Sequence, residues 1–448
     1  MAARQLIAWS NDRRVGTLAE SDDLWRFDYD PGWTAAADGF DLSPALDRAT
    51  GLHVDGATHR PVQWYFDNLL PEEAMRTLLA SEAQVPSEDA FGLLAYFGAE
   101  SAGSLLLLPP GSEPIYDEGL VKLEFAELSR RIRNLPAATL NRDAPTRMSL
   151  AGAQHKMVVV LREGALFEPL PGRPSTHILK PDHPGADYTA TVANEWFCMR
   201  LAAASGIRVP RVRRLYVPEP VYLVERFDRA SDPESGRILR RHIVDSCQLL
   251  DKARSFKYAS ATLEVLVEAI ARCRSRAAAR LQLYRWLIFN LLIGNNDNHL
   301  KNLSFIAGPE GLDLAPAYDL LCTLVYSTRA FADDRATWPN ESLTIALGET
   351  RTPGAATHGD LIAAGSALGL ARDTCARELD RMLRRLPEAA QALLADTEAD
   401  NEALIAASPD PAISRARAAG DLRVLRAIVV IVIADTVRQV LATRTDTR

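Results

Sequence analysis

A short polar loop between two apolar segments limits the folds open to this chain more than any other stretch. The loop reads Gly294-Asn295-Asn296-Asp297-Asn298-His299-Leu300-Lys301-Asn302. The segment before it keeps apolar residues at helical spacing, which predicts a helix that ends at Gly294. The segment after it, residues 303–306, is again mostly apolar. In the simplest interpretation, the Asn-rich turn satisfies its own backbone with its side chains.

The spacing of Asp297 and Asn302 also suits phosphoryl transfer. In a kinase catalytic loop, an Asp that accepts the proton of the substrate hydroxyl is followed by an Asn that holds Mg²⁺, in the pattern Asp-x-x-x-x-Asn found here. Phosphoryl transfer needs a further metal ligand, and Asp319 follows on the next segment. The intervening length allows a strand pair that would bring the two carboxylates together. The alternative is that Asp319 caps a helix opening at Leu320.

A stretch of small residues could form a loop over phosphates. It reads Ser149-Leu150-Ala151-Gly152-Ala153-Gln154-His155-Lys156 and comes directly before an apolar strand expected at residues 157–161. Small residues let backbone N–H groups approach phosphates closely. The stretch matches neither the P-loop nor the dinucleotide-binding pattern, because it has only one Gly, and a simple turn is the alternative.

Lys180 closes a second expected strand, His177-Ile178-Leu179-Lys180, which Pro181 ends. A lysine there can enter a cleft and pair with phosphates, or it can simply be solvated at the strand end. Glu195, on the helix expected next, is a candidate ion-pair partner. Together these parts follow the serial order of a protein kinase: small-residue loop, strand lysine, helix, strand, helical lobe, Asp…Asn loop and a second Asp. The residues alone therefore predict a kinase-like phosphotransferase.

Composition and charge limit the class of protein. The chain has 448 residues, of which 47% are hydrophobic and 24% charged, enough for two to four globular domains at roughly 100–200 residues each. The net charge of -7 argues against coating nucleic acid through the overall field. The five scattered cysteines contain no C-x-x-C pair, which predicts reduced thiols and a cytoplasmic protein. We expect no signal peptide and no membrane span. The apolar run 427–434 is too short to cross a membrane and instead predicts a buried helix.

Patterning along the chain predicts three kinds of structure. Residues 1 to about 110 indicate a small mixed α/β domain whose first part is a β-meander, with Trp25, Phe27 and Tyr29 on one buried face. Residues 140–230 indicate a small sheet with one helix packed on it. From about residue 260 the pattern becomes that of long helices.

These segments closely resemble the HipA family, the serine/threonine kinase toxins of HipBA-type toxin–antitoxin modules. In chain order, the matching motifs are Val15-Gly16-Thr17-Leu18, Phe66-Asp67-Asn68-Leu69-Leu70-Pro71-Glu72, Gly98-Ala99-Glu100-Ser101-Ala102-Gly103, residues 149–156, residues 177–180, Asn194-Glu195, Val224-Glu225-Arg226-Phe227-Asp228-Arg229, Asp245-Ser246-Cys247-Gln248, residues 296–302 and Pro316-Ala317-Tyr318-Asp319.

The resemblance implies an α+β, protein-kinase-like two-lobed fold, with a small mixed α/β N-terminal region and a large all-helical C-terminal lobe. It divides the chain into an N-terminal α/β subdomain at 1–110, an N-lobe with the phosphate loop and hinge at 111–255, and a helical lobe with the catalytic loop at 256–448. Because the first 110 residues are present, we expect a full-length rather than a split toxin.

The resemblance also assigns roles. Asp297 would be the catalytic base, and Asn302 and Asp319 would hold Mg²⁺. The residues that would contact ATP fall into four groups: the loop over the phosphates (Ala151, Gly152, Ala153, Gln154, His155 and Lys156), the phosphate-binding Lys180, the hinge that receives adenine (Glu225, Arg226 and Phe227), and further lining residues (His299, Lys301 and Tyr318).

Ser149 matches the family's autophosphorylation serine. A phosphate adds about −1.5 to −2 charge, and at the root of the loop it would repel ATP phosphates and expel the loop, so Ser149 is expected to be an off-switch. The implied partners are a HipB-like DNA-binding antitoxin, operator DNA held mainly through that antitoxin, and a protein substrate such as an aminoacyl-tRNA synthetase or another translation component.

Two features depart from the family pattern. Residues 326–335, which are expected to hold the substrate loop, match no family motif, and His155 stands where an acidic residue is often found. Two other functions stay open. One is a catalytically weak, kinase-fold corepressor that acts with a DNA-binding antitoxin, and the other is a kinase of a small molecule or lipid head group.

Overall fold

The computed structural model describes residues 4–115, 119–148, 150–152, 154–407 and 410–444. Ser149 and Ala153 therefore lie outside the described residues. The chain divides into two compact units. Unit 1 consists of Met1–Pro181, Leu215–Ala259 and Leu303–Ala315, and unit 2 of Asp182–Arg214, Ser260–Asn302 and Pro316–Arg448. The three-part division expected from the sequence stays a prediction.

The α+β class with a large helical C-terminal part is confirmed. Unit 1 holds the sheets and a few helices. Unit 2 is built from helices over its described residues, apart from the start of one strand that continues into unit 1.

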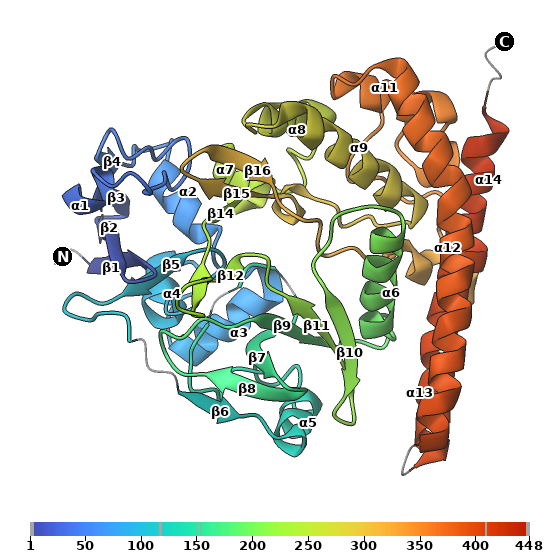
Figure 1. Ribbon diagram of the computed structural model, residues 1–448, viewed down its shortest axis with the longest axis horizontal. Coiled ribbons are helices and arrows are strands. Elements are labelled where there is room, and N and C mark those ends of the chain that lie inside the picture. The colour runs from blue at the N-terminus through green and yellow to red at the C-terminus, as the bar shows by residue number, and fades with distance from the viewer. Residues whose placement is uncertain (1–3, 116–118, 149, 153, 408–409, 445–448) are drawn as a thin grey trace. The chain divides into compact units, whose positions relative to one another are not determined.

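The first sheet of unit 1 is antiparallel and has five strands in the order β4-β3-β2-β1-β5 (Figure 1). These are β1 (Arg4–Ser10), β2 (Arg13–Ser21), β3 (Leu24–Tyr29), β4 (Leu52–Val54) and β5 (Leu105–Leu108). The expected meander is confirmed, and in β3 the residues Trp25, Phe27 and Tyr29 are buried while their neighbours are exposed. Four helices accompany this sheet: α1 (Pro31–Thr34), α2 (Pro61–Asp67), α3 (Glu73–Ala83) and α4 (Ala90–Phe97).

The second sheet carries the segments predicted to contact nucleotide. Its order is β10-β11-β9-β7-β8-β6, with β6 (Leu120–Lys122), β7 (Met157–Arg162), β8 (Ala165–Pro169), β9 (His177–Pro181), β10 (Val212–Tyr216) and β11 (Pro220–Glu225). Helix α5 (Phe125–Arg133) packs on it, and Leu128 of α5 shares a buried core with Met157, Val159, Leu179 and Leu223. This core holds β9 and β11 in a central position.

Two small sheets complete unit 1. One is a strand pair, β12 (Arg229–Ser231) and β13 (Ile238–Arg240), and the other has the order β14-β15-β16. Its strands are β14 (Ile243–Asp245), β15 (Ser304–Gly308) and β16 (Gly311–Leu314). Two short helices of unit 1, α7 (Ser246–Leu249) and η1 (Arg254–Phe256), follow β14 in the chain. β15 and β16 are the strand pair expected between Asp297 and Asp319. They also interrupt the stretch predicted to be helical, because the backbone of β15 pairs with β14 on one side and with β16 on the other.

Unit 2 consists of long helices with short connecting turns. Its elements are α6 (Thr191–Ala204), α8 (Leu263–Ala271), α9 (Arg276–Leu292), η2 (Leu300–Asn302), η3 (Leu324–Ser327), α10 (Arg329–Ala332), η4 (Asp333–Arg335), η5 (Pro353–Ala355), α11 (His358–Ala367), α12 (Arg372–Ala407), α13 (Pro411–Ala427), η6 (Ile428–Ile433) and α14 (Ala434–Ala442). Helices α12 and α13 pack against each other, and Figure 1 shows them side by side in orange and red.

Helix α9 ends as the sequence predicts. Leu283, Leu287 and Leu291 bury one face, and Gly294 follows the last turn with φ +64, the left-handed conformation that favours glycine. The apolar run near the C-terminus is only partly the buried helix expected there. Residues Ile428–Ile433 form a π-helix, and although most of its side chains are buried, Val430 is 65% exposed.

All five cysteines are free and buried. Burial raises the pKa of Cys198 and Cys322 above the usual range for a thiol, so these side chains act as small core residues. Within the described residues, no helix combines the length and the apolar character that a membrane span requires.

Unit 1 contains a buried histidine whose protonation opposes folding. The His242 ring stacks on Phe40 with centroids 4.0 Å apart, and its Nε2 and Nδ1 atoms lie 2.9 Å from the Leu42 carbonyl and 3.1 Å from the Ser104 hydroxyl. Burial lowers the pKa of His242 from 6.5 to about 4. The unfolded chain therefore binds a proton that the folded chain does not between these two values.

We expect stability to fall as the pH drops from 6.5 towards 4. The His242 contribution lost by pH 5 is about 2 kcal/mol, since one pKa unit corresponds to about 1.4 kcal/mol. Urea unfolding at pH 7 and pH 5 checks this. The His242→Gln variant is expected to show a smaller pH effect, while His59→Gln, which changes a histidine that is 67% exposed, retains it. Equal pH effects in all three proteins would contradict the assignment.

Candidate functional site

The polar loop of residues 294–302 is held by asparagine side chains from within unit 2. Asn290, buried near the end of α9, accepts a 2.7 Å hydrogen bond from Asn295 Nδ2. Asn295 Oδ1 in turn accepts a 3.1 Å bond from the Asp297 N–H. The simpler interpretation, an Asn-rich turn that satisfies its own backbone, is thus correct for part of the loop. Asn295 forms hydrogen bonds with a backbone N–H group and with the Asn290 side chain.

Asn302 closes the loop onto Asp297. Its Nδ2 atom donates to the Asp297 carbonyl at 2.6 Å, and its backbone N–H donates to the His299 carbonyl at 3.0 Å. The bond to the loop backbone uses the Nδ2 atom of the amide, and Oδ1 is the atom that a hard cation would take. Asp297 keeps 43% of its side-chain surface exposed, and His299 Nε2 lies 3.8 Å from Asp297 Oδ1.

Asp319 does not cap a helix. No helix begins at Leu320; the next element is η3, which starts at Leu324. Asp319 instead adopts φ +57, a left-handed backbone conformation that is uncommon outside glycine and is often found at functional sites. The next residues, Leu320 and Leu321, are buried.

Two contacts fix the segment around Asp319. Asn194 of α6 forms a two-bond clamp with the Cys322 backbone, donating to its carbonyl at 2.9 Å and accepting from its N–H at 2.8 Å. Tyr318 donates from its hydroxyl to the Lys301 carbonyl at 2.7 Å. Sequence reasoning gave Asn194 no role; a polar residue within the apolar face of a helix was the signal that could have found it.

Asn295 joins the loop to the Asp319 segment. Its side chain accepts from the Asp297 N–H and lies within 3.5 Å of the Asp319 carbonyl through Nδ2. The three predicted catalytic and metal-holding residues therefore belong to one network. Among the described residues, no group of three or more His, Cys, Asp or Glu side chains could hold a metal ion. Hard oxygen donors from Asn302 and Asp319 suit Mg²⁺, which keeps waters and phosphate oxygens as its other ligands.

The small-residue loop in unit 1 is closed by its own lysine. Lys156 Nζ donates to the Ala151 carbonyl at 2.6 Å. Gly152 has φ +110, and a Cβ atom there would stand 2.7 Å from Lys156 Nζ. The conformation thus depends on glycine at this position, both for the backbone angle and for the approach of the lysine.

Lys180 is not a solvated strand end. Lys180 lies on β9, opposite Tyr222 of β11, and is only 7% exposed. Its Nζ atom lies 5.9 Å from the centre of the Tyr222 ring. Glu195, its predicted partner, is a buried residue of α6 in unit 2, and their pairing stays a prediction.

The hinge residues differ from what was expected in one case. Glu225 is exposed at the end of β11 and Phe227 is half-buried. The Arg226 side chain is buried and bonds to Glu100 and Asp228. Its backbone N–H donates to the Thr176 carbonyl. The Arg226 side chain therefore helps to hold the hinge in place, and contact of this residue with a nucleotide stays a prediction.

Comparisons with known protein families match two regions of the chain. Residues 148–390 match the family model described as the HipA-like C-terminal domain, and residues 6–108 match the HipA N-terminal domain. All the predicted site residues lie within the first of these matches.

Two relatives match over most of their length. The chain is 37% identical over 339 residues to "Putative kinase Y4mE" of Sinorhizobium fredii, covering 73% of this chain and 79% of that protein. It is 31% identical over 404 residues to "Serine/threonine-protein kinase toxin HipA" of Shewanella oneidensis, covering 84% and 86%. A solved structure of the Shewanella oneidensis toxin–antitoxin complex of HipA, HipB and operator DNA contains a similar chain, with a TM-score of 0.75, 27% identity and coverage of 98% and 97%.

Proposed function

Because this chain belongs to the HipA family, we propose that it is an ATP-dependent serine/threonine protein kinase and the toxin of a type II toxin–antitoxin system. The observation that carries this proposal is the network in unit 2, in which Asn302 closes the loop on Asp297 and Asn295 links that loop to Asp319. Two relatives carry the name of kinase.

In the proposed reaction, the Asp297 carboxylate accepts the proton of a serine or threonine hydroxyl. The hydroxyl oxygen then forms a bond to the γ-phosphorus of ATP as the bond to the β-phosphate oxygen breaks, and ADP leaves. Asn302 and Asp319 would hold Mg²⁺, which neutralises charge on the phosphate oxygens. Partial exposure of Asp297 suits this role, because a protein substrate must reach it.

The remaining residues would position ATP. Lys180 would contact the phosphates from its buried place in β9, and residues 151–156 would cover them. Glu225 and Phe227 would receive the adenine, while Arg226 supports them from behind. His299, Lys301 and Tyr318 would line the site next to the catalytic loop.

We propose partners from the similarity to the solved Shewanella oneidensis complex. The similar Shewanella chain was solved with HipB and operator DNA. We propose that this chain binds a HipB-like DNA-binding antitoxin and reaches operator DNA mainly through it. The protein substrate would be a component of translation, such as an aminoacyl-tRNA synthetase, whose modification arrests growth. Phosphate on Ser149 would switch the kinase off by repelling the phosphates of ATP.

Incubation with γ-labelled ATP tests the function. We expect label in the protein fraction, including the chain itself, and its loss when EDTA removes divalent cations. The Ser149→Ala variant should lose most of the label on the chain, while Ser112→Ala, at an exposed serine of the same unit, should keep it.

Other outcomes point elsewhere. Label that appears only in a small-molecule fraction would indicate a kinase of small molecules or lipid head groups. Binding to an antitoxin–operator complex without any phosphate transfer would indicate a corepressor. Mass spectrometry that places most of the phosphate away from Ser149 would overturn the off-switch.

A further inference from the structure

A groove of about 520 Å³ lies among the C-terminal helices of unit 2. It is lined by the end of α12, by α13, by η6 and by Ala330 of α10, and the pair α12 and α13 is visible in Figure 1. The aliphatic lining includes Ile405, Leu422 and Val430. Among the described residues that line the groove, three are arginines and only Glu402 is acidic.

Two of the three arginines that line this groove, Arg415 and Arg423, form no ion pair with a described carboxylate. Arg423 donates to the backbone carbonyl of Ala330 and lies over the Phe331 ring, 4.9 Å from its centre. Arg415 is exposed and has no carboxylate partner among the described residues. Only Arg426 forms an ion pair, with Glu398. The groove is thus positive on a chain whose net charge is -7, which favours an anionic partner.

The π-helix η6 contributes Val430 and Ile431 to the aliphatic part of the groove. Val429 and Val432 of this segment are buried, whereas Val430 is 65% exposed and faces the groove. π-helical turns are rare and occur mostly at functional positions. An aliphatic side chain exposed beside a basic rim is typical of a surface that receives a protein segment with one apolar face.

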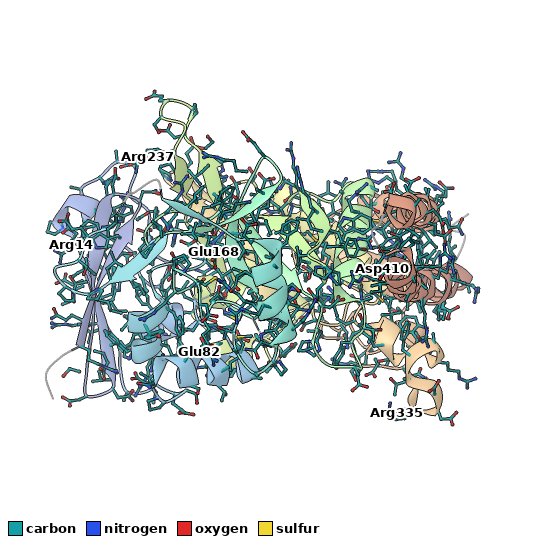
Figure 2. All side chains as sticks on the ribbon, turned by 90° about the horizontal axis from the view of Figure 1, so that it is seen from below. Arg14, Glu82, Glu168, Arg237, Arg335 and Asp410 are labelled. Atoms are coloured by element: carbon teal, nitrogen blue, oxygen red, sulfur yellow. The ribbon has the colours of Figure 1, made fainter. Side chains whose placement is uncertain are left out.

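The groove is connected to the candidate site by direct packing. On the buried side of η6, a Cβ atom at Gly294 would stand only 2.7 Å from Val432 Cγ1, so the π-helix touches the residue that opens the catalytic loop. On the rim, Arg423 holds Ala330 and Phe331, which belong to residues 326–335, the segment expected to receive substrate. Arg335 of that segment is exposed and extends outward (Figure 2).

We propose that this groove docks an acidic, amphipathic helix of a partner protein. Aliphatic side chains of that helix would lie beside Val430 and Ile405, and its carboxylates would pair with Arg415 and Arg423. The lining contains no aromatic side chain on which bases could stack and is mostly aliphatic, which argues against a nucleic acid. The docking proposal does not depend on the proposed kinase activity. Only the effect of docking on residues 294–302 and 326–335 bears on the proposed function.

Fluorescence anisotropy with a designed peptide tests the docking. The probe is a labelled peptide of about four helical turns with Leu on one face and Glu on the other. We expect it to bind the full chain, more weakly as salt rises. Val430→Asp and the double variant Arg415→Glu/Arg423→Glu should each weaken binding at least about tenfold. Matched controls outside the groove, Ile413→Asp and Arg438→Glu, should leave it unchanged.

Hydrogen exchange without ATP tests the connection, so its result is independent of the kinase assay. We expect the bound peptide to slow exchange in residues 294–302 and 326–335. Binding without such slowing would overturn the connection. Equal binding of a peptide with Lys in place of Glu, equal binding by the groove variants, preference for duplex DNA, or occupation of the groove by a second copy of the chain would overturn the docking proposal.

Discussion

Replacement of Asp297 by Asn should lower the rate of phosphate transfer about 10³-fold or more and remove growth inhibition. The change keeps the size of the side chain and removes the base that accepts the hydroxyl proton, a contribution that typically amounts to 10²–10⁴ in rate. The free energy of unfolding should stay within about 1 kcal/mol. Two of the bonds that hold residue 297, from Asn295 and Asn302, reach its backbone, and its side chain is 43% exposed.

Initial rates of label transfer and urea unfolding of the same protein check this result. Asp396→Asn is the matched control, because it makes the same change at an exposed position of α12 in the same unit. It should retain full activity and toxicity. A toxic Asp297→Asn variant, or one that transfers phosphate at the normal rate, would contradict the catalytic assignment.

Replacement of Glu100 by Gln should destabilise unit 1 by about 3–5 kcal/mol, the range for removal of one partner from a buried ion pair. Glu100 is fully buried, and its two carboxylate oxygens accept from Arg226, Arg229 and Arg240 at 2.9, 2.8 and 2.6 Å. Asp228 is the other carboxylate of this cluster and bonds to Arg226 and Arg229. The variant would leave three buried guanidinium groups with one carboxylate.

The pKa shifts within the cluster agree with a loss of stability when Glu100 is replaced. Burial alone would raise the pKa of the Glu100 carboxyl, but the three guanidinium groups outweigh burial and hold that pKa well below its usual value. Burial, together with the charges of Arg226 and Arg240, lowers the pKa of Arg229 to about 10, while Asp228 and Glu100 oppose this shift. Removal of an anion therefore raises the free energy of the folded state.

Urea unfolding followed in unit 1 checks this prediction. Glu113→Gln, at an exposed glutamate of the same unit, is the matched control and should change stability by less than about 0.5 kcal/mol. In the double variant Glu100→Gln/Arg240→Gln, the loss should be smaller than the sum of the single losses, because the excess of positive charge is reduced. Additive losses would show that Glu100 and Arg240 do not stabilise each other. An unchanged midpoint in Glu100→Gln would show that the cluster does not stabilise the unit.

Elements that depend on near neighbours could be predicted from the sequence. The alternation of Trp25, Phe27 and Tyr29 indicated β3, and the apolar spacing that ends at Gly294 indicated α9, because side-chain periodicity follows from backbone geometry alone. The strand pair between Asp297 and Asp319 was also expected, since a short connection between apolar segments allows little else.

Partners far apart in the chain could not be predicted in this way. Arg226 was expected at a nucleotide. Its side chain instead forms an ion pair in a buried cluster with Glu100, which lies 126 positions earlier in the chain. Asn194 meets the Cys322 backbone across a separation of 128 residues, a clamp on the Asp319 segment that no local pattern records. The π-helical turn that exposes Val430 likewise contrasts with an apolar run expected to be buried.

The order of motifs along the chain and their chemistry were thus available from residue types alone, because a catalytic loop needs an Asp and an Asn at a set spacing. The tertiary structure was needed to show which side chains serve the backbone and which are left for chemistry. The physical reason is that a buried polar group bonds to whatever packing brings within about 3 Å, and packing is settled by the whole core rather than by neighbours in the chain.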